Sequence, residues 1–123
     1  MKFRQVAQRI TDVNRAVEFY SQLLSSEPIA VFEQPGFAFF DLEGVRLFLD
    51  ANAASTLLYF QVDDVRQSVE KLVSLGHKVT TEPHVVFPDP SGLFDQPGNE
   101  WLAFIEDSEG NSIGLMSREV DSY

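Results

Sequence analysis

The fold of this chain is decided by two stretches with the same pattern, Asp12-Val13-Asn14-Arg15-Ala16-Val17-Glu18 and Asp64-Val65-Arg66-Gln67-Ser68-Val69-Glu70. Each begins with an aspartate that can cap a helix, and each continues with apolar residues at helical spacing. A strand-like run precedes each cap, at residues 3–10 and 56–62. The chain therefore begins a strand and then a helix twice, and the two caps lie 52 residues apart (64 minus 12).

A second match closes each half. The turn Asp41-Leu42-Glu43-Gly44 corresponds to Asp107-Ser108-Glu109-Gly110 at an offset of 66 residues (107 minus 41), and alternating aliphatic residues follow both turns. The second half therefore holds 14 more residues than the first (66 minus 52). We place them in the Pro- and Gly-rich segment 83–99, which we expect to be irregular. Capped helices and such turns are individually common, but two matches in the same order favour duplication over chance.

Short strands are predicted between these matches. Turn residues separate strand-like runs at 29–32, 36–41 and 45–50 in the first half, and at 78–81, 101–106 and 111–117 in the second. The predicted fold class is α+β, with tandem β-α-β-β-β units that form a curved mixed sheet with a concave pocket. We expect a single domain over residues 1–123, with one unit at 1–54 and the other at 55–123.

Length and composition limit the classes of function. A chain of 123 residues suits one compact domain, and 44% hydrophobic residues are ordinary for a folded, soluble protein. The chain has no cysteine, which excludes disulfides, thiolate metal sites and a cysteine nucleophile. No apolar run is long enough for a membrane helix or a signal peptide, so we expect a cytoplasmic protein. The net charge of −10 makes nucleic acid and membrane surfaces poor partners.

The chain resembles the vicinal-oxygen-chelate superfamily, which includes glyoxalase I, bleomycin-resistance proteins and extradiol dioxygenases. The resemblance covers nearly the whole chain and is carried by three groups of residues: Val6-Ala7-x-x-Ile10-x-Asp12 leading into Ala16-Val17-Glu18-Phe19-Tyr20, then Val62-x-Asp64-Val65, and Phe104-x-x-Asp107-x-Glu109-Gly110-Asn111-Ser112-Ile113. In that family each half forms a curved sheet with its helix outside. The resemblance therefore implies the same fold here.

The resemblance also implies a divalent metal site. Family members hold the ion with His or Gln from the first strand and Glu from the last strand of each half, which suits zinc, nickel, manganese or iron. These positions fall here on Gln5, Phe48, Leu57 and Gly114. Only Gln5 offers a donor atom in its side chain. We therefore expect no metal at the inherited site and no cofactor.

Strand alternation predicts what lines the concave side instead. Same-parity positions place an apolar and aromatic set there, with a few polar points: Gln5, Ala7, Arg9, Arg46, Phe48, Leu57, Tyr59, Trp101, Ala103, Gly114 and Met116. Such a surface suits an organic ligand, and the indole of Trp101 could stack on a planar one. The alternative is that these residues only pack the sheet or a dimer interface. Arg9 and Arg46 could hold an anionic group or pair with acids such as Glu33 or Asp50.

The segment 84–99 has the composition of a mobile lid. His84 at its base is the best general-base candidate, because histidine is the side chain most often used for that role, and Tyr59 is a weaker acid or base candidate. The only other histidine, His77, follows the second helix, is expected to be solvent-exposed, and is not spaced with His84 like a metal-binding pair.

Four functions remain open from the sequence. We favour a binding protein for a small aromatic or amphipathic molecule, because three of the four metal positions lack donors. The alternatives are a metal-dependent lyase, isomerase or dioxygenase, a metal-free enzyme that uses His84 or Tyr59, and a structural dimer module. A homodimer is expected, either swapped or unswapped.

Overall fold

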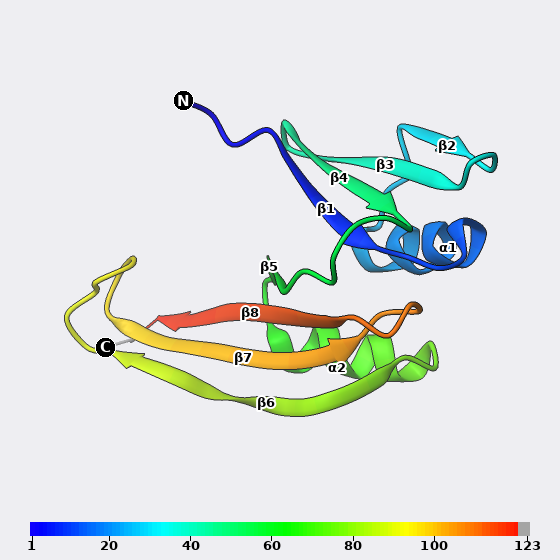
Figure 1. Ribbon diagram of the computed structural model, residues 1–123. Helices are drawn as coiled ribbons and strands as arrows, with labels where there is room; N and C mark the ends of the chain where they lie inside the picture. The colour runs from blue at the N-terminus through cyan, green and yellow to red at the C-terminus, as the bar shows by residue number, and fades with distance from the viewer. Residues whose placement is uncertain (121–123) are drawn as a thin grey trace. The chain divides into compact units, whose positions relative to one another are not determined.

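The computed structural model describes residues 1–120 and contains two helices and eight strands (Figure 1). In chain order they are β1 (Gln5–Arg9), α1 (Val13–Leu24), β2 (Ala30–Phe32), β3 (Phe37–Leu42), β4 (Val45–Asp50), β5 (Leu58–Gln61), α2 (Val65–Ser74), β6 (Lys78–Asp89), β7 (Gly98–Glu106) and β8 (Ser112–Val120). The order β-α-β-β-β occurs twice, so the predicted α+β fold is confirmed.

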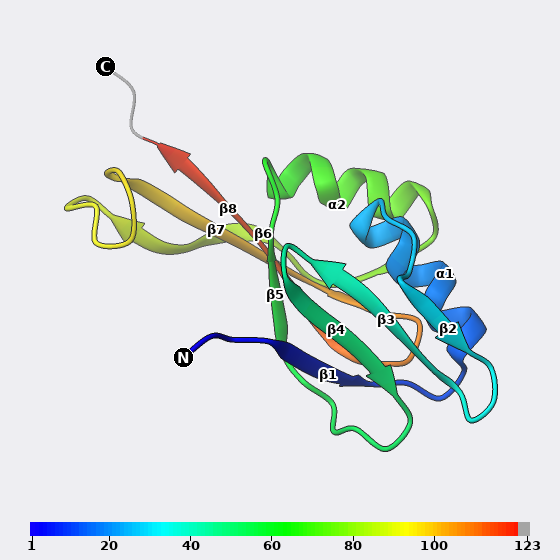
Figure 2. The ribbon, with the colours of Figure 1, turned by 90° about the horizontal axis from the view of Figure 1, so that it is seen from above.

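The strands form two mixed four-stranded sheets, one for each repeat. Their strand orders are β1-β4-β3-β2 and β5-β8-β7-β6. The pairs β1–β4 and β5–β8 are parallel, and the other neighbours are antiparallel. Figure 2 shows the long strands β6, β7 and β8 of the second sheet running side by side.

The strand registers of the two sheets agree with the duplication. Ala7 lies opposite Phe48 in the first sheet, and Tyr59 lies opposite Gly114 in the second. These pairs are related by the two offsets seen in the sequence, since 59 minus 7 is 52 and 114 minus 48 is 66. The repeat therefore extends from residue pattern to backbone hydrogen bonding.

Both predicted helix caps are present. The Asp12 carboxylate accepts a hydrogen bond from the backbone N–H of Arg15 (3.0 Å), and the Asp64 carboxylate accepts one from that of Arg66 (2.9 Å). Each satisfies a backbone donor that the first turn of a helix leaves unpaired. Three apolar residues of α2 are buried, whereas Val73 and the C-cap residue Leu75 are about half exposed: the buried ones are Val65, Val69 and Leu72.

The irregular lid predicted at residues 84–99 is wrong for most of its length. β6 continues to Asp89 and β7 starts at Gly98, so only residues 90–97 form a connection. β6 is an edge strand, where proline is tolerated because one row of backbone groups has no neighbouring strand. The pairing of β6 with β7 shifts register at three places, so β6 contains additional residues that have no partner in β7. The additional residues of the second half mainly lengthen strands.

The described chain divides into two compact units. The first comprises residues 1–56 together with Asp107–Asn111, and the second comprises 57–106 and 112–120. The change from one unit to the other at residues 56–57 lies two residues after the boundary expected at 54. That residues 1–123 act as a single domain stays a prediction.

The turn Asp107–Asn111 is held in the first unit by Glu109. Its carboxylate accepts hydrogen bonds from the backbone N–H of Thr11 (2.7 Å) and Asp12 (2.8 Å), and pairs with Arg15 Nε (2.8 Å). Burial alone would raise the pKa of Glu109, but the hydrogen bonds from Arg15, Thr11 and Asp12 outweigh it and lower this pKa to about 2. The acid of the Asp-x-Glu-Gly motif therefore stabilises the start of α1.

Asp107 of the same turn is buried and fully engaged. It accepts hydrogen bonds from the backbone N–H of Glu109 (2.9 Å) and Asn111 (2.7 Å), and from the Tyr20 hydroxyl (2.6 Å). Burial and the neighbouring Asp107 charge raise the pKa of Tyr20 well above its ordinary value. Tyr20 of α1 and Asp107 of the final turn therefore both stabilise the fold.

Each unit has its own apolar core between helix and sheet. The largest members are fully buried: Ile10, Tyr20, Phe40, Leu47 and Leu49 in the first unit, and Val65, Ile105, Ile113 and Leu115 in the second. No helix within residues 1–120 is long and apolar enough to cross a membrane.

Candidate functional site

The open face of the first sheet, which points away from α1, carries aromatic side chains. Leu47 and Leu49 of β4 are buried toward the core, so Phe48 points to the opposite face, as predicted. Phe48 stacks on Phe39 at 4.7 Å between ring centroids, and Phe37 meets Phe48 edge-on at 5.6 Å. Sequence reasoning missed Phe37 and Phe39, although their alternation with buried Ala38 and Phe40 could have identified them.

Three of the predicted polar residues share this open face. Gln5 lies opposite Arg46, and Arg9 lies opposite Asp50. All three residues on the expected face, Gln5, Arg9 and Arg46, are exposed. Of the two alternatives for Arg9 and Arg46, the pairing with Glu33 or Asp50 is not found, since neither arginine has a carboxylate partner within 4.0 Å among residues 1–120.

The open face of the second sheet brings together three residues named from the sequence. Tyr59 of β5 lies opposite Gly114 of β8, and Met116 is two residues further along β8 on the same face. Leu57 is exposed and directly precedes β5. Strand alternation therefore correctly grouped Tyr59, Gly114 and Met116.

The predicted position of Trp101 on the concave side is wrong. Trp101 pairs with Ser117, whose hydroxyl accepts a hydrogen bond from the backbone N–H of Val65 at the start of α2 (3.0 Å). The Arg66 guanidinium lies 4.4 Å from the Trp101 ring centroid. Trp101 and the fully buried Ala103 thus face α2. Trp101 shares the parity of the buried Ala103 and Ile105, and these buried positions assign its side of the strand to the core.

Gly114 lies at a position where the resemblance implies a metal-binding glutamate, and the structure leaves no room for a side chain there. A Cβ atom at this position would lie 2.5 Å from Cδ2 and 2.9 Å from Cε2 of Tyr59. These distances are far below the 3.5–4.0 Å of normal carbon contacts. The Tyr59 ring, which also meets Phe104 edge-on at 6.0 Å, occupies the space that a side chain at 114 would need.

The residues present do not fit a divalent ion at the inherited positions. Phe48, Leu57 and Gly114 have no lone pairs in their side chains, and Gln5 alone provides one amide oxygen. In the described part of the chain, no three His, Cys, Asp or Glu residues are grouped so that they could hold a metal ion.

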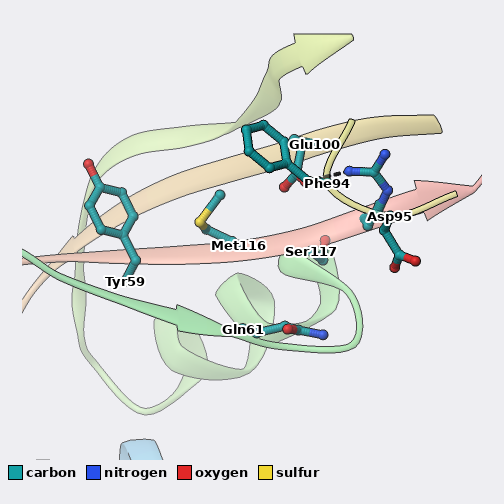
Figure 3. Close-up of a pocket in the computed structure, with 8 residues that line it drawn as sticks. Tyr59, Gln61, Phe94, Asp95, Glu100, Met116 and Ser117 are labelled. Atoms are coloured by element: carbon teal, nitrogen blue, oxygen red, sulfur yellow. Dashed lines mark hydrogen bonds and ion pairs between the residues drawn. The ribbon is translucent and has the colours of Figure 1, made fainter. Parts of the chain in front are cut away.

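A pocket of about 250 Å³ lies on the second unit, partly on the open face of its sheet (Figure 3). Its lining combines rings and a thioether with charged and polar groups: Tyr59, Gln61, Phe94, Asp95, Glu100, Met116, Ser117 and Arg118. Tyr59 and Met116 were named from the sequence. The others were missed, because only the fold brings the turn after β6 beside β5 and β8.

Arg118 ties this turn to the sheet. Its guanidinium pairs with Asp89 and with Glu100 (Nη1 to Oε1, 2.5 Å), and donates to the Gln96 carbonyl oxygen (2.6 Å). Asp89 in turn accepts a hydrogen bond from the backbone N–H of Leu93 (2.8 Å). The hydrogen bond to Asp89 is the main cause that raises the pKa of Arg118. The turn at 90–97 is therefore anchored to the sheet by hydrogen bonds, unlike the mobile lid predicted from its composition.

His84 lies within β6, not at the base of a loop. It pairs with Leu102 in the register, so it faces the same side of the sheet as Met116, but it does not line the pocket. Its Nδ1 is 3.0 Å from the Glu82 carbonyl oxygen, and the side chain is exposed. No acidic side chain within residues 1–120 pairs with it. The second histidine, His77, is half-buried, contrary to the expectation of a solvent-exposed residue.

Comparison with solved structures supports the fold. A structure described as a conserved domain protein matches with a TM-score of 0.74 at 18% identity, covering 97% of this chain and 100% of the other. The lactoylglutathione lyase of Agrobacterium tumefaciens matches with a TM-score of 0.69 at 21% identity, covering 94% of this chain and 92% of the enzyme. At these identities the similarity concerns the fold alone.

Comparison of sequences gives the family. The trivalent organoarsenical cleaving enzyme of Bacillus sp. (strain MD1) is 27% identical over 119 residues, which cover 85% of this chain and 73% of that enzyme. The family model of the Glyoxalase/Bleomycin resistance protein/Dioxygenase superfamily matches residues 2–115. With its two β-α-β-β-β units and this match over most of its length, the chain belongs to the Glyoxalase/Bleomycin resistance protein/Dioxygenase superfamily.

Proposed function

We propose that this protein binds a small organic molecule in the pocket of its second unit and uses no divalent ion at the positions where its relatives place one. The observation that carries the proposal is the Tyr59 ring over Gly114, which fills the space of a metal-binding carboxylate and forms part of the pocket wall. Tyr59 thus blocks the inherited metal position at Gly114 and also lines the pocket.

The size and lining of the pocket support a small ligand. A dry cavity of roughly 150 Å³ can hold benzene, so about 250 Å³ suits one ring with a substituent. Tyr59, Phe94 and Met116 offer apolar surface, while Gln61 and Glu100 offer polar atoms that can orient a ligand. This combination is typical of small-molecule sites.

Metal and ligand analysis of the purified protein tests the proposal. Equilibrium dialysis against nickel, zinc, manganese or iron(II), followed by elemental analysis, should show less than stoichiometric binding. Native mass spectrometry of protein purified from its source should show an additional mass that denaturation releases. A stoichiometric ion that tracks a catalytic activity would overturn the proposal.

A second candidate is cleavage of a trivalent organoarsenical, the activity that names the Bacillus enzyme to which this chain is 27% identical. This chain has no cysteine, so it offers no protein thiolate to a thiophilic arsenic atom. Incubation with phenylarsonous acid and each of the four ions, with inorganic arsenite measured by chromatography, decides between the candidates. Release of arsenite only in the presence of one ion would favour the enzyme.

Three expectations accompany the proposal and stay predictions. The protein is expected to be a homodimer, which sedimentation velocity can measure, and exposed apolar residues on β6, namely Val85, Val86 and Phe87, are available for such contact. Neither nucleic acid nor membrane is expected as a partner, and a cytoplasmic location is expected. The structure gives no support to a metal-free reaction that uses His84, because no acidic side chain in residues 1–120 pairs with this histidine.

A further inference from the structure

We infer that the pocket of the second unit takes a small aromatic cation, a molecule with one ring and an ammonium or amidinium group, and this inference rests on the proposed binding function. It names the chemical class of ligand that the charges and rings around the pocket would select.

The charges at the pocket leave an excess of carboxylate. Arg118 is the only basic residue in the lining, and its single positive charge is matched by two carboxylates, Asp89 and Glu100. Asp95 adds a third carboxylate to this region, and it has no cationic partner within residues 1–120. An anionic ligand would therefore be repelled, whereas a cation would be attracted.

Glu100 provides the specific anchor. Its side chain is only 17% exposed, and its Oε1 is held by Arg118 at 2.5 Å. Its second oxygen, Oε2, accepts no hydrogen bond from any described residue. An oriented, mostly buried carboxylate with one unused oxygen is suited to accept a hydrogen bond from an N–H group that carries positive charge.

The apolar part of the ligand has two walls. Tyr59 rises from β5, and Phe94 projects from the turn after β6 with 70% of its surface exposed; Met116 lies between them in the view of Figure 3. The faces of aromatic rings contact apolar groups of a ligand and also attract cations. The hydrogen bond from the backbone N–H of Phe94 to Asp89 (3.3 Å) holds the base of this wall in place.

Three near-isosteric probes separate charge from shape: benzamidine, which is a cation at neutral pH, benzamide, which is neutral, and benzoate, which is an anion. Each is titrated into the full-length ¹⁵N-labelled protein while backbone NMR shifts are recorded. We expect dissociation constants on the order of millimolar for probes of this size, with benzamidine about 5-fold or more tighter than benzamide and benzoate weakest. The shifts should centre on the pocket residues.

Two substitutions with matched controls test the two parts of the site. Glu100→Gln should remove most of the preference for benzamidine over benzamide and leave benzamide binding unchanged. Its control is Glu106→Gln, the same change further along β7 on the same face and outside the pocket. Phe94→Ala should weaken all three probes by about 3- to 10-fold, benzamidine no less than the others, whereas Leu93→Ala, at an equally exposed neighbour outside the lining, should not.

The possible outcomes are distinct. If benzamide or benzoate shifts the pocket residues and binds as tightly as benzamidine, the cation inference is overturned and the proposed binding function stands. If the preference for benzamidine survives Glu100→Gln, or Glu106→Gln removes it equally, the anchor is wrong and the inference fails. If none of the probes shifts any pocket residue up to its solubility limit, both the inference and the proposed pocket are overturned.

Discussion

Replacing Gly114 by alanine should have opposite effects on stability in two backgrounds. In the natural chain the new Cβ would lie 2.5 Å from Cδ2 of Tyr59. In a Tyr59→Ala background this obstacle is gone, and the nearest remaining atom is Cε1 of Phe104 at 3.3 Å, whose half-buried ring needs to move by only a few tenths of an ångström. The pair of measurements thus tests directly whether the Tyr59 ring occupies the space above Gly114.

The expected magnitudes follow from the contacts. Tyr59 is 50% exposed, so its ring can swing outward and the overpacking should cost about 1–3 kcal/mol. Replacing a strand glycine by alanine favours folding by about 0.5–1 kcal/mol, because it restricts the unfolded chain. Gly114→Ala should therefore lower the free energy of unfolding by about 1 kcal/mol in the natural chain, and raise it by about 0.5–1 kcal/mol in the Tyr59→Ala background.

Urea unfolding followed by the fluorescence of Trp101, the sole tryptophan, measures all four proteins of the cycle. The control background is Gln61→Ala, since Gln61 is the next residue of β5 on the same face and lies opposite Met116 instead of Gly114. There the substitution at 114 should keep its destabilising sign. If Gly114→Ala shifts stability equally in the natural and Tyr59→Ala backgrounds, the ring does not fill this space.

Three further predictions concern the turn 107–111 and the anchored turn after β6. The lowered pKa of Glu109, about 2 against an ordinary 4.5, means that its contribution is fully present above about pH 4.5 and is lost as pH falls toward 2. After allowance for solvent screening, the natural chain should lose about 1 kcal/mol more than Glu109→Gln between pH 7 and pH 3 in urea unfolding; equal losses would contradict this. Tyr20→Phe removes a donor from buried Asp107 and should lower the unfolding free energy by about 2 kcal/mol, whereas a loss below about 0.5 kcal/mol would show that the hydroxyl is not needed. Arg118→Gln should speed amide hydrogen exchange of the Leu93 N–H by about 10-fold, and unchanged exchange would mean that the turn holds itself.

Much of the fold was predictable because it depends on local patterns. Asp12 and Asp64 each cap a helix through contacts within three residues, and the alternation of Leu47 and Leu49 around Phe48 assigns the faces of β4. Such signals lie within one element and do not require knowledge of its neighbours.

The candidate site was predictable only in part. Tyr59 and Met116 follow from alternation along their own strands. Phe94 and Glu100 were missed because the length of β6, the start of β7 and the place of the turn depend on an edge strand that tolerates Pro83 and Pro88. Trp101 was misplaced because its face depends on the register of β7 with β8, in which it lies opposite Ser117, and this register is a tertiary property.

The sequence by itself determined that the chain is a duplicated β-α-β-β-β protein and that three of the four inherited metal positions carry no donor. Periodicity shows the repeat, the family resemblance gives the metal positions, and a missing oxygen or nitrogen is then visible in the residue name. Only the tertiary structure decided that the Tyr59 ring fills the space above Gly114 and that Arg118 anchors the turn carrying Phe94. Both facts depend on distances between residues far apart in the chain, which no local pattern encodes.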